Sequence, residues 1–556
     1  MGRRRTTVAV VSAAVSLLAV AAALAASSGQ QATRDTLVFG VSTDPVGLDP
    51  SLISDGESLR VTDQIFESLT GFQVGGSKVV PELATSWRAS RNGLAWTFNL
   101  RRNVRFSDGT PFNSAAVCFN YNRWYNFPGP LQNASVSYYW NTVFGGFARP
   151  VSGSPGPAKS LYRGCRTNGA NSVTILLRRP STSFLSAIGL PNFGIASPAA
   201  LRRYQANAGT VDASGVFHPK GTFSTANPVG TGPYMLRSWR TGDRLELVRN
   251  PSYWGRKAIL NRIIFRPIPD NAARLQALQT GEIHGYDGVA PEDIRTIQRN
   301  SKFRLVTRPT SSVGYVGINQ AMKPMDNLLV RQAIAYGLDR PSLVKAFYPP
   351  GTQVANQFLP PSLIGHARSG VTNYPYNPEK ARSLLEEAGL TLPVKIDMWY
   401  PTDVTRPYMP DPSKNFQAFA ASLEKSGFDV TAHTAPWRPD YLGGAQGGKY
   451  QVYLFGWISD YYDPANFLNV HFGAFSPQFG FRAPQLFSLL TRADAETNLD
   501  TRAALYRRAG VQVMRILPMV PYVWAGSALG FDRSVRGFVP GPIGPVNEPL
   551  SRVSLG

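Results

Sequence analysis

The stretch that decides the fold is Tyr450-Gln-Val-Tyr-Leu-Phe-Gly-Trp-Ile-Ser-Asp-Tyr-Tyr-Asp-Pro464. Its first half is aromatic, β-branched or apolar, which predicts a buried strand. The strand runs into Trp457, Asp460 follows three residues later, and Asp463-Pro464 ends the segment in a turn. One carboxylate therefore lies just beyond the carboxyl end of a buried strand, the edge where ligands bind in α/β sheets. A carboxylate at that edge indicates a cationic group on the ligand.

The length and composition of the chain predict a globular protein of at least two lobes. A chain of 556 residues is too long for one hydrophobic core, and 43% of its residues are hydrophobic. The net charge is +22, and the basic residues are mostly arginines that we interpret as evenly spread beyond Arg3–Arg5. Because no basic stripe or reading motif is visible, we expect no nucleic-acid partner.

The N-terminal segment has the layout of a secretory signal peptide. Arg3-Arg4-Arg5 precedes an uncharged, mostly apolar stretch, and Ala23-Leu24-Ala25 gives a small-x-small cleavage pattern. We expect cleavage near Ala25, so that residues 1–30 form signal peptide and linker; an uncleaved anchor helix is the alternative. No cysteine lies near this region, so the usual bacterial lipid attachment point is missing.

The chain has two cysteines, Cys118 and Cys165. In an exported protein an even count allows one disulfide, and two unpaired thiols are the alternative. The bond would have a structural role, since it would close a loop rich in glycine, proline and aromatic residues.

Seven segments in order resemble the extracellular solute-binding protein family 5, the oligopeptide- and dipeptide-binding proteins of peptide-type ABC importers. The segments are Pro81–Trp87 with Leu94–Phe112, Gly230–Tyr234, Val248–Trp254, Leu278–Ile283, Val330–Arg340, Tyr376–Ala381 and Trp457–Pro464. One such motif is weak, but seven in family order are a specific signal.

The resemblance implies an α/β fold of two lobes, the large class of the periplasmic-binding-protein-like fold, with the ligand between the lobes. Lobe I would be discontinuous, comprising residues 36–75, 190–310 and 517–556, with an inserted subdomain at 76–189. Lobe II would cover residues 311–516. The hinge crossings would lie near Pro309–Ser312 and Leu517–Pro518, and the ligand would drive closure by contacting both lobes.

The resemblance also implies a site and a function. In peptide-binding relatives, the aspartate matching Asp460 receives the peptide's terminal ammonium, and a charge-assisted bond of this kind is strong when buried. The alternative is that Asp460 merely caps the turn before Pro464. The remaining ligand-binding candidates are Trp457, Trp437 and Tyr315 as wall residues, each of which could equally be core, and Ser54 and Asp55 facing the cleft from the other lobe.

The implied protein is a monomer that binds short peptides without a cofactor or metal and delivers them to ABC permease subunits. Two departures limit this reading. Leu454 replaces an arginine that contacts the peptide's far end in the oligopeptide-binding relative, and Ser311-Ser312 and Ile458 replace that relative's disulfide. The ligand could therefore be a longer peptide, or a nickel chelate, haem, oligosaccharide or opine, which other members bind. A receptor for peptide signals would have the same sequence.

The alternative from a different functional class is that the protein is an exported enzyme. The sequence contains no Gly-x-Ser-x-Gly elbow and no His-Glu-x-x-His pair. The five histidines are far apart in sequence, which argues against a metal cluster. We therefore expect no catalytic residues.

Overall fold

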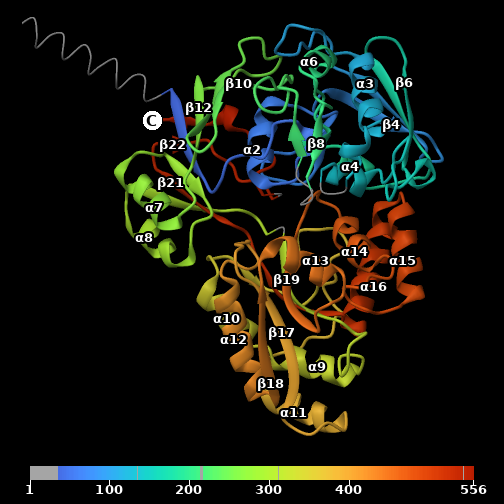
Figure 1. Ribbon diagram of the computed structural model, residues 1–556, viewed down its shortest axis with the longest axis vertical. Coiled ribbons are helices and arrows are strands. Elements are labelled where there is room, and N and C mark those ends of the chain that lie inside the picture. The colour runs from blue at the N-terminus through green and yellow to red at the C-terminus, as the bar shows by residue number, and fades with distance from the viewer. Residues whose placement is uncertain (1–34, 134–135, 213–216, 311, 543) are drawn as a thin grey trace, which may run out of the picture.

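The computed structural model describes residues 35–133, 136–212, 217–310, 312–542 and 544–556. These residues form two large lobes, one above the other in Figure 1, each built around its own sheet and hydrophobic core. The predicted signal peptide and its cleavage site lie outside the described residues. Among the residues described, no helix is long and apolar enough to cross a membrane.

Lobe I contains a seven-stranded sheet of order β10-β11-β12-β1-β13-β21-β14. Its strands are β1 (Thr36–Val41), β10 (Tyr234–Arg240), β11 (Arg244–Arg249), β12 (Arg262–Pro267), β13 (Gly285–Asp287), β14 (Phe303–Thr307) and β21 (Ala528–Asp532). Its helices are α2 (Gly56–Ile65), α6 (Pro198–Arg203), α7 (Asn271–Thr280) and α8 (Ile294–Arg299). Short ribbons add β2 (Thr70–Phe72) with β3 (Val79–Pro81), β8 (Gly209–Val211) with β9 (Phe217–Pro219), and β22 (Val535–Arg536) with β23 (Ser554–Leu555).

The inserted subdomain has its own four-stranded antiparallel sheet of order β4-β5-β7-β6. Its elements are β4 (Ala84–Ala89), β5 (Ala95–Leu100), α3 (Ser114–Tyr125), α4 (Tyr138–Val143), β6 (Tyr162–Thr167), β7 (Ser172–Leu177) and α5 (Phe184–Ala187). Cys118 on α3 and Cys165 on β6 form a disulfide, which ties the helix to the sheet.

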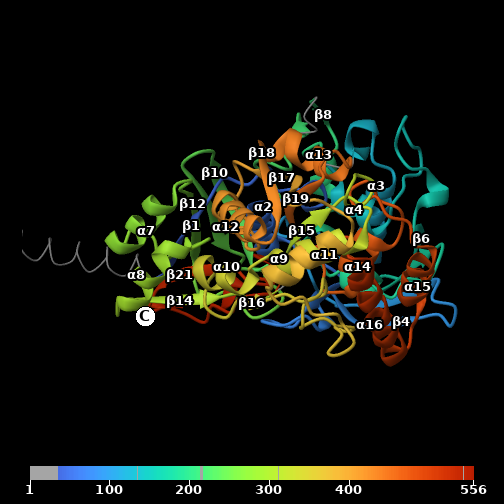
Figure 2. The ribbon, with the colours of Figure 1, turned by 90° about the horizontal axis from the view of Figure 1, so that it is seen from below.

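Lobe II contains a six-stranded sheet of order β16-β20-β15-β19-β17-β18. Its strands are β15 (Ser312–Ile318), β16 (Gln353–Val354), β17 (Val394–Pro401), β18 (Phe428–Ala435), β19 (Val452–Ile458) and β20 (Met519–Trp524). Its helices are α9 (Leu328–Gly337), α10 (Arg340–Phe347), α11 (Pro378–Glu387), α12 (Pro412–Lys425), α13 (Leu442–Gln446), α14 (Pro464–Phe472), α15 (Pro484–Ala495) and α16 (Leu499–Ile516). The view from below shows these helices spread along both sides of the sheet (Figure 2).

The chain crosses between the lobes twice, and the two crossings lie side by side. The first follows β14 at residues 308–310 and leads to β15, and the second, residues 525–527, joins β20 to β21. The amide of Arg308 donates to the carbonyl of Ser527 at 2.9 Å, and the Ser312 hydroxyl donates to the carbonyl of Ala525 at 2.6 Å. A Cβ atom on Gly526 would collide with the carbonyl oxygen of Arg308, so this approach needs glycine.

The second crossing differs from the expected position near Leu517–Pro518. β20 pairs with β15 in the sheet of lobe II, so lobe II extends to Trp524 and the last segment of lobe I begins at Ala528. The sequence does not reveal this because Pro518 marks the end of α16, and the strand that follows could join either sheet.

Candidate functional site

β19 is a buried central strand of lobe II, and its surroundings explain where Asp460 lies. It pairs antiparallel with β15 and parallel with β17, and Val452 to Gly456 are buried. After the strand, the Ser459 hydroxyl donates to the carbonyl of Tyr461 at 2.8 Å. Asp463 then caps α14, since its carboxylate accepts the Ala465 amide at 2.9 Å. The capping role that was the alternative for Asp460 thus belongs to Asp463.

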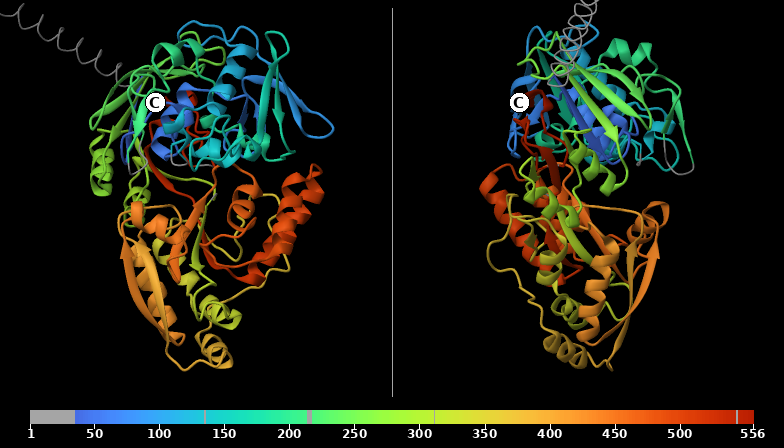
Figure 3. Two further views of the ribbon diagram at one scale, coloured as in Figure 1. Left: turned by 45° about the vertical axis from the view of Figure 1, so that its right-hand side comes forward. Right: turned by 90° about the vertical axis from the view of Figure 1, so that its left-hand side faces the viewer.

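The Asp460 carboxylate lies where lobe II meets the inserted subdomain. It accepts the Tyr139 hydroxyl at 3.1 Å, the Asn466 amide at 3.1 Å and, more weakly, the Tyr138 hydroxyl at 3.5 Å. Tyr138 and Tyr139 begin α4, which lies at the bottom of the upper lobe in Figure 1, and lobe II lies below it in both views of Figure 3. Both tyrosines were visible in the sequence only as part of an aromatic loop.

Asn466 holds Asp460 in place from within lobe II. Its side-chain oxygen accepts the backbone amide of Asp460 at 2.8 Å and the Trp457 indole N–H at 3.1 Å. The Trp457 ring also packs edge-on against His471, with 4.6 Å between centroids. Trp457 therefore supports the carboxylate through Asn466.

Asp460 is surrounded by neutral groups. Burial raises its pKa to about 6, while the hydrogen bonds from Asn466, Tyr139 and Tyr138 act in the opposite direction. Within the described chain, no lysine, arginine or histidine forms an ion pair with it. A buried carboxylate without a cation is penalised, and a cationic ligand group would remove the penalty.

A second carboxylate, Asp55, reaches the same region from lobe I. Asp55 is the N-cap of α2, and one of its oxygens accepts the Ser58 amide at 2.8 Å. The other oxygen is buried and has no hydrogen-bond partner among the described residues. Both Asp460 and Asp55 act electrostatically on the Tyr139 hydroxyl, whose pKa is raised mainly by burial. Its neighbour Ser54 is exposed, and no side-chain contact of it is observed in the described part of the chain.

Three loops of lobe II meet at one edge of the sheet, because β17 pairs parallel with both β18 and β19. Trp437 follows β18 and stacks on Phe455 of β19, with 5.5 Å between centroids. Arg406, in the loop after β17, places its guanidinium 5.4 Å from the centre of the Trp437 ring. No described acid pairs with this guanidinium. Nothing in the sequence singled out Arg406, since one arginine in a loop is no motif.

Tyr315 does not belong to the site. Its side chain is fully buried, and its hydroxyl accepts the Gln478 amide at 3.2 Å within the core of lobe II. The β15 strand is central, so the face that carries Tyr315 is covered by helices. Of the two equal readings of Tyr315, this burial favours the core reading.

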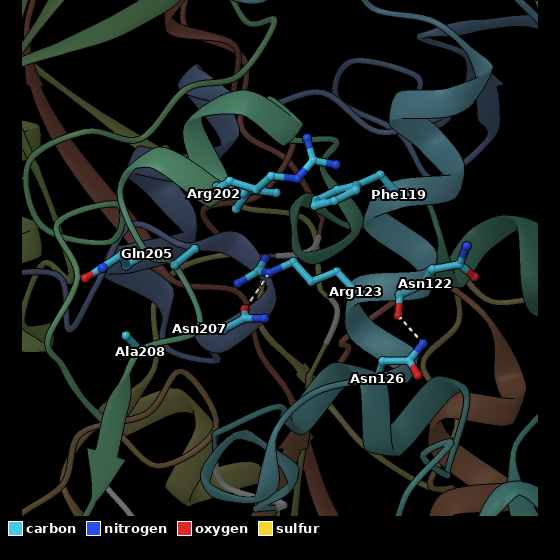
Figure 4. A pocket seen from close by; sticks show the side chains of 10 residues that line it. Phe119, Asn122, Arg123, Asn126, Arg202, Gln205, Asn207 and Ala208 are labelled. Carbon is cyan, nitrogen blue, oxygen red and sulfur yellow. Dashed lines mark hydrogen bonds between the residues drawn. The ribbon is translucent and has the colours of Figure 1, made fainter.

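A metal cluster and a surface pocket are two other kinds of binding site to consider in this molecule. Among the described residues, no group of three or more His, Cys, Asp or Glu side chains could hold a metal ion. A pocket of ≈ 640 Å³ opens between α3 and α6 (Figure 4). Its Arg123 binds Asn207 at 2.8 Å and Asp49, its Arg202 stacks on Phe119, and its lining contains none of the predicted ligand-binding residues.

Comparison with known proteins decides the family. The pattern that describes the middle region of the bacterial extracellular solute-binding proteins, family 5, matches residues 78–478. The chain belongs to this family. The match covers most of the chain and includes nearly all of the inserted subdomain, the first crossing between the lobes and Asp460.

Relatives within family 5 are similar over nearly their whole length. The heme-binding protein A of Haemophilus influenzae is 29% identical over 531 residues, 93% of this chain and 92% of the relative. The dipeptide-binding protein of Escherichia coli is 28% identical over 524 residues, 92% of this chain and 93% of the relative. The periplasmic binding protein DppA of Helicobacter pylori, solved with the peptide STSA, is 26% identical with a TM-score of 0.75, covering 95% and 99% of the two chains. The two-lobed fold predicted from the sequence is confirmed.

Proposed function

We propose that this protein captures short peptides with a free amino terminus between its lobes and delivers them to the membrane permease of an ABC importer. The observation that carries the proposal is the buried Asp460 carboxylate, which meets only neutral donors in the described chain. A peptide ammonium fits this position because it brings a positive charge and three donors.

Known relatives support a peptide ligand. The Escherichia coli protein of this family is a dipeptide-binding protein, and the Helicobacter pylori structure contains a bound peptide. The Haemophilus influenzae relative is named for heme, so family membership alone does not select the ligand. The argument for peptides therefore rests on the ammonium site.

Arg406 is our candidate for the far end of the ligand. Leu454, which stands where an oligopeptide-binding relative has an arginine, is completely buried and cannot reach a ligand. Arg406 instead offers a guanidinium with no acidic partner at the same edge of the sheet as Asp460. Asp460 and Arg406 follow neighbouring parallel strands, so one short ligand at this edge of the sheet would meet both groups.

The ligand's positive charge would be bound by one carboxylate from each lobe. Asp460 approaches from lobe II and Asp55 from lobe I, and both lie near the Tyr139 hydroxyl. A ligand ammonium between them attracts both lobes, and it does so only when they are closed. Its binding energy therefore shifts the equilibrium toward the closed form. The peptide backbone would pair with the protein as an added strand, giving affinity without reading side chains.

The proposal also covers the protein's location, its partners and the roles of the other site residues. The protein would be exported, with cleavage near Ala25, and would act as a monomer without catalytic activity. Its partners would be the peptide and the permease subunits. Trp437 would form the wall of the site, Trp457 would support Asp460, and Ser54 and Asp55 would face the ligand from lobe I.

Mass spectrometry of the ligand that co-purifies with the exported protein is the test. We expect a mixture of short peptides with free amino termini. Calorimetry with a dipeptide pool and the same pool acetylated at the amino group provides the control. Recovery of heme, a sugar or a metal chelate, with no heat from either peptide pool, would overturn the proposal.

A further inference from the structure

The inserted subdomain has a strong excess of positive charge. Residues 76–189 contain thirteen Lys and Arg residues but only two Asp and Glu residues, whereas residues 311–516 contain nineteen and sixteen. The even spread of basic residues that we expected from the sequence is therefore wrong. The excess positive charge is concentrated in the inserted subdomain.

Neither acid of the subdomain neutralises this charge. The Glu82 carboxylate accepts the backbone amide of Ser68 at 2.7 Å. Asp108 accepts the hydroxyl of Ser197 at 2.6 Å and the amide of Thr110 at 2.9 Å. In the described structure, neither acid forms an ion pair with an arginine of the subdomain.

The outer face of the four-stranded sheet presents part of this charge. Its inner face packs into the subdomain core through residues such as Phe98 and Ile175. Register pairing brings one outward row across all four strands: Arg88, Thr97, Thr174 and Arg166. The two threonine hydroxyls in the centre hydrogen-bond to each other at 2.9 Å, and the arginines occupy the two outer strands. This sheet forms the outer edge of the upper lobe, with α3 on its inner side (Figure 1).

Three more arginines lie at one end of the same sheet. We define the arginine face as Arg88, Arg91, Arg163, Arg166 and Arg178, all of which are exposed. Leu177 pairs with Tyr162, and its amide bonds the carbonyl of Leu94, so the chain segments that carry Arg91, Arg163 and Arg178 meet at this end. Only Arg178 has a contact, with the Tyr125 hydroxyl at 3.4 Å. The other four guanidinium groups have no partner in the part of the chain that is described.

We propose that the arginine face docks on the anionic phospholipid headgroups of the membrane. Guanidinium groups bind phosphate in a bidentate manner, and each basic residue near an anionic membrane contributes about fivefold in binding. The arginines lie on both outer strands of a four-stranded face, about 15 Å apart at about 4.8 Å per strand, so the charge is spread over an area and matches an extended anionic surface better than a single polymer chain. Docking would hold the protein at the membrane, where the proposed permease lies.

Vesicle sedimentation of the exported protein tests this proposal. We expect binding to vesicles of phosphatidylcholine with phosphatidylglycerol, no binding to phosphatidylcholine alone, and loss of binding at high salt. The variant Arg88→Gln/Arg166→Gln should bind about 25-fold more weakly, at about fivefold per arginine. The matched control is Arg507→Gln/Arg508→Gln, which removes two exposed arginines from α16 of lobe II and should bind like the wild type.

The contrary outcomes are equally clear. Equal binding to neutral and anionic vesicles overturns the proposal, and so does an equal loss in both arginine variants. Binding to soluble poly(glycerol phosphate) without binding to vesicles would also overturn it and assign the face to a phosphate polymer. Peptide affinity should be unchanged in both variants, so the outcome is independent of the proposed ligand.

Discussion

The substitution Asp460→Asn keeps the shape of the side chain and removes its charge. In the unliganded protein, burial raises the pKa of Asp460 from 3.8 to about 6. A shift of about two units corresponds to about 3 kcal/mol, and we expect about 2 kcal/mol because the residue keeps some exposure. The folded-state pKa is higher than the unfolded-state pKa, so the charged carboxylate destabilises the fold above pH 6. The variant should therefore be more stable than the wild type at pH 7.5, with the difference vanishing toward pH 4.

Binding should change in the opposite direction. Removing one partner of a buried charge pair costs about 2–5 kcal/mol, and about 3 kcal/mol raises Kd about 150-fold. Calorimetry at pH 7.5 should show this loss for a dipeptide with a free amino terminus. For the same peptide acetylated at its amino group, wild type and variant should bind equally weakly.

Asp63 provides a matched control. It lies on α2, its carboxylate accepts the Asn547 amide at 3.1 Å within lobe I, and burial raises its pKa to about 7. Asp63→Asn should therefore alter stability without changing peptide affinity. The anchoring role is refuted if Asp460→Asn binds the free peptide within about threefold of wild type, or if both aspartate variants lose affinity equally.

Four further outcomes are expected. Peptide affinity should fall about tenfold per pH unit below about pH 6, because protonation of Asp460 removes the charge that binds the ammonium, and titration calorimetry across this range would expose a flat profile. Arg406→Gln should weaken binding of a free dipeptide about 30-fold, from about 2 kcal/mol, but should leave a carboxyl-amidated peptide unaffected; equal losses would exclude carboxylate recognition. Asp55→Asn should weaken peptide binding about tenfold without lowering the melting temperature, since its buried oxygen has no donor in the described structure, and unchanged calorimetric affinity would contradict this. Replacing Cys118 and Cys165 by serine should lower the free energy of unfolding by about 4 kcal/mol for a separation of 47 residues, and a denaturant titration showing a change below about 1 kcal/mol would be inconsistent with this role.

The sequence predicted those parts of the protein that depend on local pattern. The α7 helix is one such part: it spans Asn271–Thr280 because Asp270 caps its start and Gly281 takes the left-handed conformation at its end, and both signals are local. The strand before Asp460 was equally clear from its run of apolar residues.

Contacts between distant segments could not be predicted in this way. Tyr139 meets Asp460 across 321 residues, and only the placement of the inserted subdomain against lobe II brings them together. Arg406 reaches the site because β17 and β19 are parallel neighbours, which local patterns do not specify. Tyr315 shows the same limit. An aromatic residue on a central strand has the same sequence pattern whether it faces a ligand or the core, so the pattern could not choose between the two.

The paired crossings between the lobes have a consequence for how this protein evolves. The Arg308 amide bonds the Ser527 carbonyl at the crossings, and the Arg308 guanidinium binds Asp287 at 2.7 Å and Glu548 at 2.6 Å. None of these groups belongs to the loops that carry the candidate ligand residues. Under the proposed closure about these crossings, ligand choice and the rate of opening would depend on separate segments, and mutation could alter either one while the other is preserved.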